Sequence, residues 1–148
     1  MKRILLVFLL LSIAHFSHTP HLKVTDPSSW FNESNWDHDA SVAEILAPDS
    51  EFYDAYEYKI DEEFVLRKLA HITFFGLLAL LFLANVKQNR LRYVKAFVYT
   101  ALFALSDELH QAFVIGRDGR MWDVLLDSVS GLVFLVGYFM MTRWRKRY

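Results

Sequence analysis

The 148-residue sequence has no cysteine, only five glycines and three prolines, and almost equal numbers of acidic and basic residues. Without cysteine the chain has no disulfide, no thiolate metal site and no cysteine nucleophile. The low glycine and proline content, with 54% hydrophobic residues, excludes fibrous repeats and a disordered chain. A formal net charge of −1 argues against a nucleic-acid partner. The length corresponds to one domain, or to one domain with an appendage.

Charged residues are missing altogether from four stretches of the chain: 4–22, 69–86, 96–106 and 128–142. A helix needs about 20 mainly apolar residues to cross roughly 30 Å of hydrocarbon. The second stretch nearly has this length, whereas the third and fourth reach it only as 94–113 and 122–142, with ionisable residues at one end. The sequence therefore predicts an all-α, four-helix, multi-pass membrane protein.

The first uncharged stretch has two interpretations. Lys2 and Arg3, an apolar run to Leu11 and small residues around Ala14 are typical of a signal peptide. Cleavage after Ala14 would give an unusually short one, so we favour an uncleaved, signal-like anchor that forms the first membrane helix over 1–20. In either case the segment that follows lies outside the cytoplasm.

That segment, residues 21–65, is predicted to be a long, acidic, partly helical loop between the first two membrane helices. Twelve of the 17 acidic residues lie between residues 17 and 66. Asp49 can cap a helix, and apolar residues then recur near the helical period at Phe52, Tyr56, Ile60 and Phe64. We expect an amphipathic helix over 50–64.

The basic residues set the orientation. Ten of them, with no acid between, flank the uncharged stretches: Lys2, Arg3, Lys87, Arg90, Arg92, Lys95, Arg143, Arg145, Lys146 and Arg147. The positive-inside rule places such segments in the cytoplasm. Both termini, including the basic tail 143–148, are therefore expected in the cytoplasm, and the acidic loop outside.

Ionisable residues within a membrane helix are costly and are functional candidates for that reason. Three predicted helix ends bring such residues to one outward-facing layer: Lys68, His71, Asp107, Glu108, His110, Gln111, Asp123 and Asp127. Carboxylates this close repel unless a cation, a proton or an arginine lies between them. Arg117 and Arg120, in the short outer loop, are near enough in sequence to serve.

Three interpretations of this layer stay open. The first is recognition of an anionic ligand, with Arg117, Arg120 and Lys68 as its contacts. The second is an enzyme, whose acid–base candidates are His71, Glu108 and His110 and whose divalent-cation ligands would be Asp107, Glu108, Asp123 and Asp127. No nucleophile motif or glycine-rich phosphate loop supports the enzyme, and no other cofactor is expected. The third is a network that only fixes helix packing.

His15, His18 and His21 recur every third residue, but they are a weak metal site because the helix is expected to end there.

The segment SDELHQAFVIGR at 106–117, followed by WDVLLD at 122–127 and by Gly131, resembles the VanZ-like family, as does RKLAH at 67–71. The resemblance covers a three-helix core over 66–142. It maps the family's signature positions onto Lys68, His71, Ser106, Asp107, Glu108, His110, Gln111, Gly116, Arg117, Asp123, Asp127 and Gly131. Ile115 stands where a proline is usual, and Phe74 stands where many members carry glutamate, which would leave His71 without a polar partner.

The resemblance implies a small multi-pass protein of the bacterial cytoplasmic membrane. The family's namesake is associated with resistance to the glycopeptide teicoplanin. We therefore expect action at the outer face on a cell-envelope ligand, either a glycopeptide or a lipid-linked wall precursor. The alternatives become a metal-dependent enzyme on a phosphate-linked lipid, and a structural or assembly partner in the membrane.

Overall fold

The computed structural model describes residues 1–33, 36–37, 40–56 and 60–145. The regular elements of these residues are helices: α1 (Lys2–His18), η1 (Pro27–Phe31), α2 (Val42–Ile45), η2 (Glu51–Tyr53), α3 (Glu62–Asn85), α4 (Arg92–Ala112) and α5 (Met121–Trp144). An isolated antiparallel bridge joins Trp36 and Val114. The all-α prediction is confirmed for the described residues, and α4 and α5 begin and end within two residues of the predicted ranges.

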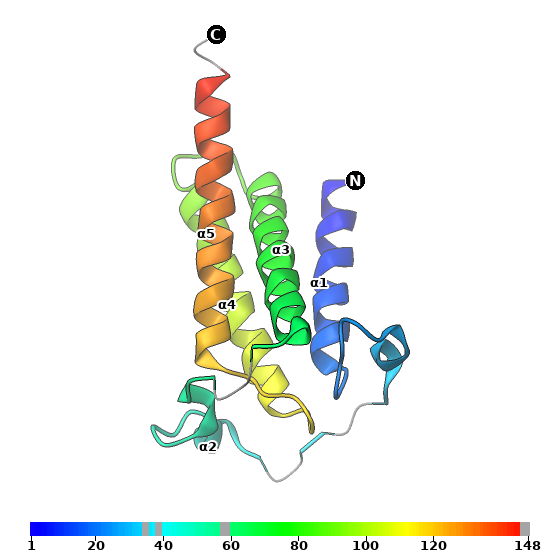
Figure 1. Ribbon diagram of the computed structural model, residues 1–148. Helices are drawn as coiled ribbons and strands as arrows, with labels where there is room; N and C mark the ends of the chain where they lie inside the picture. The colour runs from blue at the N-terminus through cyan, green and yellow to red at the C-terminus, as the bar shows by residue number, and fades with distance from the viewer. Residues whose placement is uncertain (34–35, 38–39, 57–59, 146–148) are drawn as a thin grey trace.

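Four long helices pack side by side, with α3 in contact with α1, α4 and α5 (Figure 1). The contact between α3, α4 and α5 depends on small residues. A Cβ on Gly131 of α5 would lie 2.9 Å from Cγ2 of Thr100 and 3.3 Å from Cβ of Ala79. Gly131 therefore sets how closely α5 approaches α3 and α4, and through them the spacing of the site.

The two ends of the bundle differ in charge. The start of α1, the turn after α3 and the end of α5 lie at one end, and the segment between α1 and α3 lies at the other with the loop after α4 (Figure 1). The basic residues near positions 2, 90 and 143 are thus gathered at the first end, and the acidic segment is at the second.

Two helices, α3 and α5, are long and apolar enough to cross a membrane by length and composition, and each has 24 residues. Their sequences explain this, because each contains an uncharged stretch of 15 residues or more.

The amphipathic helix predicted over 50–64 is corrected by the structure. Ser50, not Asp49, precedes a single 3₁₀ turn, Asp54 after this turn has an extended backbone, and α3 starts only at Glu62; residues 57–59 lie outside the described residues. The carbonyl oxygens of positions 54 and 55 accept hydrogen bonds from Nη1 of Arg120, 3.2 Å each. This tertiary contact uses the acceptors that a helix would need.

Candidate functional site

Buried polar side chains from α3, α4 and α5 meet at the end of the bundle that carries the acidic segment. Glu108 and Asp127 are fully buried, and Asp107, Gln111 and Asp123 are nearly so. Burial of a carboxylate requires hydrogen-bond or charge partners among the neighbouring groups.

Gln111 is the centre of a hydrogen-bond network at the end of α4. Its Nε2 donates to Oδ2 of Asp107 at 3.0 Å and to Oε1 of Glu108 at 2.9 Å. Its Oε1 accepts from Nη2 of Arg117 at 2.8 Å, and Ser17 Oγ on α1 donates to Oδ2 of Asp107 at 2.8 Å. The i, i+4 spacing of Asp107 and Gln111 permits this arrangement, which links α1, α4 and the loop after α4.

Glycines let the loop after α4 fold back onto this helix. A Cβ on Gly119 would overlap the backbone carbonyl of Glu108 and the backbone nitrogen of Ala112. Gly116 has a φ of +82°, a conformation that favours glycine. The close approach allows the backbone N–H of Arg120 to donate to Oε2 of Glu108 at 3.0 Å.

Lys68 on α3 is paired with Asp123 on α5, and Tyr56 joins the pair. Lys68 Nζ contacts Oδ1 of Asp123 and donates to the Tyr56 hydroxyl at 3.0 Å. That hydroxyl donates to Oδ1 of Asp123 at 2.7 Å, and Nζ lies 4.2 Å from the centre of the Tyr56 ring. Burial, followed by the hydrogen bond to Asp123, raises the pKa of the Tyr56 phenol.

A second pair joins the same helices one turn further along. Nδ1 of His71 lies 3.2 and 3.1 Å from the two carboxylate oxygens of Asp127, and the imidazole stacks on Phe75. The expectation that Phe74 leaves His71 without a polar partner is therefore wrong, because α5 supplies the partner. Phe74 instead forms part of a cavity wall.

His71, Glu108 and Asp127 could together hold a metal ion, since one ligand atom from each lies within 4.8 Å of the others. Of the predicted metal ligands, Glu108 and Asp127 are in this group. Asp107 and Asp123 are held elsewhere, by Gln111 and Lys68 respectively. A set of one imidazole nitrogen and two carboxylates suits Mn²⁺ or Zn²⁺ better than Mg²⁺.

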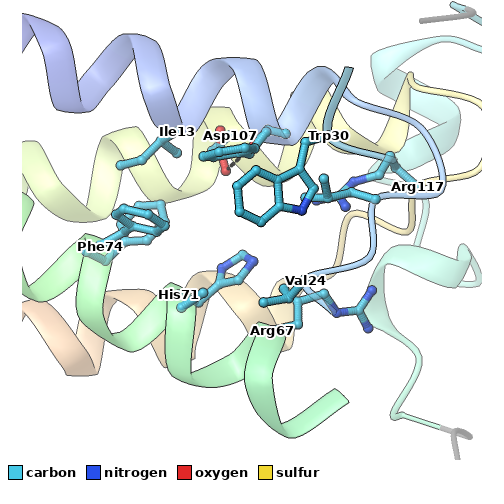
Figure 2. A pocket seen from close by; sticks show the side chains of 13 residues that line it. Ile13, Val24, Trp30, Arg67, His71, Phe74, Asp107 and Arg117 are labelled. Atoms are coloured by element: carbon cyan, nitrogen blue, oxygen red, sulfur yellow. Dashed lines mark hydrogen bonds between the residues drawn. The ribbon is translucent and has the colours of Figure 1, made fainter. Parts of the chain in front are cut away.

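A cavity of about 390 Å³ lies between α1, α3, α4 and the chain that follows α1 (Figure 2). Its walls are mostly apolar. Figure 2 shows Ile13 and Phe74 toward one end and Arg67 and Arg117 toward the other, with His71 and Asp107 between them. The cavity is thus amphipathic along its length.

Arg67 and Arg117, which line the cavity, each have a buried Nε atom with no hydrogen-bond partner among the described residues. Burial and the neighbouring Arg67 lower the pKa of Arg117 from its usual value. The two guanidinium groups therefore place two cations and unused donors at one end of the cavity.

Several predicted site residues lie outside this cluster. Ser106 is exposed and donates to the carbonyl of Phe103 at 2.9 Å. His110 faces α1, with its Nε2 3.1 Å from Nδ1 of His18, and packs against Trp36. Gly131 lies deeper, in the helix contact described above.

The three histidines at the end of α1 have separate surroundings. Nε2 of His15 contacts the carbonyl of Trp30, His18 contacts His110, and the ring of His21 lies against Gly116. They do not gather around one point, so the metal hypothesis for them gains no support.

Three residues of the site were missed by sequence reasoning: Ser17, Tyr56 and Arg67. For Ser17 and Tyr56 the sequence carries no indication, because their partners are 90 and 67 positions away. Arg67 could have been found, since it is a charged residue next to Lys68 at the start of a membrane-type helix.

Comparison with known proteins adds one finding. No curated protein and no solved structure matches the chain. The sequence model of the VanZ/LLP1 family matches residues 3–142, which is nearly the whole chain. The matched range includes every residue of the polar cluster. With the two apolar helices, this match indicates a membrane protein. The chain belongs to the VanZ/LLP1 family.

Proposed function

We propose that this protein acts at the outer face of the bacterial cytoplasmic membrane by recognising a cell-envelope ligand, such as a glycopeptide antibiotic or a lipid-linked wall precursor. The observation that carries the proposal is that Arg67 and Arg117 line the amphipathic cavity with buried Nε atoms that have no hydrogen-bond partner among the described residues. Buried donors of this kind favour an anionic ligand.

The proposed topology has four membrane helices, with the first over 1–20 and both termini in the cytoplasm. The gathering of basic residues at the end of the bundle that holds the first residues of α1 and the last of α5 supports it. The cavity would then open toward the outer leaflet and the cell wall.

The arginines do not share one task. Arg120 directs its guanidinium to the carbonyl groups of residues 54 and 55, and Lys68 is engaged with Asp123. Contact with an anionic ligand therefore falls to Arg117 and Arg67, both of which line the cavity. Gln111 would orient Arg117 through its Oε1.

The test is growth of a deletion strain, complemented with variants, against a panel of envelope antibiotics that includes teicoplanin. We expect Arg117→Gln to remove the phenotype that the wild-type chain restores, and Arg90→Gln, an exposed arginine at the opposite end, to keep it. Membrane levels of both variants are measured in parallel. Full complementation by Arg117→Gln would contradict the proposal, and loss of folded protein would favour the structural alternative.

A second function, a metal-dependent enzyme acting on a phosphate-linked lipid, is favoured by the approach of His71, Glu108 and Asp127. A bound divalent ion there would polarise a phosphoryl oxygen. This alternative predicts that Mn²⁺ or Zn²⁺ raises the unfolding temperature of the purified protein. The increase would vanish in Asp127→Asn and persist in Asp123→Asn, and no increase in the wild type would leave recognition as the better account.

A further inference from the structure

The cavity beside α1 has two chemically different ends. Phe74 of α3 and Ile13 of α1 lie toward one end, and Arg67 and Arg117 lie toward the other (Figure 2). An apolar space that holds only water is unfavourable, and so is a buried guanidinium nitrogen without an acceptor. A ligand that satisfies both ends must itself be amphiphilic.

The charged end favours an anion. Two guanidinium groups line it, and the only carboxylate among the lining residues that the structure describes is that of Asp107. Both Ser17 and Gln111 already donate hydrogen bonds to Asp107. The arginines thus outnumber the acid, and planar guanidinium donors match the geometry of phosphate oxygens.

The size of the cavity limits the ligand. About 390 Å³ is near the lower end of the range for small-ligand sites. A headgroup with the first part of one hydrocarbon chain fits this space, and a lipid with two complete chains does not. Trp30 and Val24, from the chain after α1, cover the middle of the cavity, where Figure 2 shows them facing His71.

We propose that this cavity binds an anionic amphiphile, with a phosphate-type headgroup at Arg67 and Arg117 and a single hydrocarbon chain against Phe74 and Ile13. The inference rests on the proposed function and names its ligand class. A free phosphate ion shares the headgroup chemistry, but it leaves the apolar part of the cavity unfilled.

Direct binding to the full-length protein, purified in a neutral maltoside detergent, tests the inference. The probes are dodecyl phosphate, inorganic phosphate and dodecanol, and native mass spectrometry measures the binding of each one to the protein. We expect dodecyl phosphate to bind at least tenfold more tightly than either of the others. Equal binding of inorganic phosphate would overturn the amphiphile, and equal binding of dodecanol would overturn the role of the arginines.

Two kinds of variant locate the ligand. Arg67→Gln and Arg117→Gln should each weaken dodecyl phosphate binding about 10- to 100-fold, the range for a lost hydrogen bond to a charged group. Ala70→Leu narrows the cavity without changing an arginine and should also weaken binding. Arg90→Gln and Ala84→Leu are the matched controls, since neither residue lines the cavity. If Arg117→Gln does not fold, Arg67→Gln and Ala70→Leu carry the test, and unchanged binding in both would overturn the inference.

Binding and growth assays separate this inference from the proposed function. If the wild type does not bind dodecyl phosphate but Arg117→Gln still fails to complement the deletion strain, the ligand class is overturned and the proposed function stands. Binding that depends on Arg67 and Arg117, with no growth phenotype for either variant, would support the ligand class and overturn the proposed function.

Discussion

Nδ1 of His71 lies 3.1 Å from Oδ2 of Asp127, one helical turn along the bundle from the contact between Lys68 and Asp123. The spacings are i, i+3 on α3 and i, i+4 on α5, so each helix presents its two residues on one face. Two polar pairs in successive turns fix the register of α3 against α5. Contacts between α3 and α5 alone, without a ligand, therefore explain the spacing of the two residues on each helix.

The pair between Lys68 and Asp123 should be sensitive to removal of one partner. Both side chains are nearly buried, so Lys68→Met leaves a buried carboxylate with Tyr56 as its remaining contact. We expect a loss of about 3–5 kcal/mol in the free energy of unfolding. The measurement is denaturation of the purified protein followed by circular dichroism.

The double variant Lys68→Met with Asp123→Leu is the control for that experiment. Because it removes both charges, it should recover much of the lost stability. A double variant as unstable as Lys68→Met alone would show that the lysine contributes through packing and not through its charge.

Tyr56 should make the stability of the protein depend on alkaline pH. Its pKa is raised above 10 by burial and by the hydrogen bond to Asp123, so the folded protein keeps the phenolic proton where the unfolded chain has lost it. This contribution is fully present below the unfolded pKa, near 10, and is lost as the pH rises further.

The free energy of unfolding, measured between pH 8 and 11, should therefore fall more steeply for the wild type than for Tyr56→Phe. The difference between the two curves isolates the contribution of the tyrosine. Parallel curves would contradict the assigned hydrogen bonds.

Much of the helical core could be predicted from the sequence. Uncharged stretches and their flanking charges predict the first and last residues of α4 and α5 to within two positions. The exclusion of charge from a long helix is a strong and local pattern. The recurrence of apolar residues near the helical period at Phe52, Tyr56, Ile60 and Phe64 was misleading. There, Arg120 and the buried Phe52 hold the chain in a tertiary arrangement that overrides local helix formation.

The site could be predicted only in part. The contact of Asp107 with Gln111 follows from their i, i+4 spacing, since both residues lie in one helix. Spacing within a helix does not show which acid pairs with Lys68 or His71, because those contacts join separate helices. The amphipathic cavity was not predicted at all, since it needs the chain after α1 to fold back over α3, which positions Trp30 and Val24 on its wall.

The absence of native cysteine gives a direct test of the proposed topology. Asp118→Cys and Asn89→Cys each introduce one thiol, at exposed positions on opposite ends of the bundle. We expect a membrane-impermeant maleimide to label the first variant in intact cells and the second only after the membrane is permeabilised. The reverse pattern would place the cavity and its arginines on the cytoplasmic side, and it would overturn recognition at the outer face.

Gly119 and Gly137 form a matched pair for testing the fold of the loop after α4. A methyl group on Gly119 would overlap backbone atoms of Glu108 and Ala112, which have no side-chain freedom to give way. Gly119→Ala must therefore displace the loop, break the hydrogen bond from the Arg120 backbone to Glu108 and move Arg117. We expect a loss of about 2 kcal/mol or more in stability, together with loss of dodecyl phosphate binding.

Gly137 has no atom within 4 Å of the position of an added Cβ. Gly137→Ala, in the interior of α5, should leave binding unchanged and keep or slightly raise the stability, since alanine favours a helix by about 1 kcal/mol over glycine. Thermal unfolding of both variants beside the wild type measures the difference. Equal stability of the two variants would show that the loop after α4 does not pack on Glu108 as closely as the structure has it, and that the position of Arg117 does not depend on this contact.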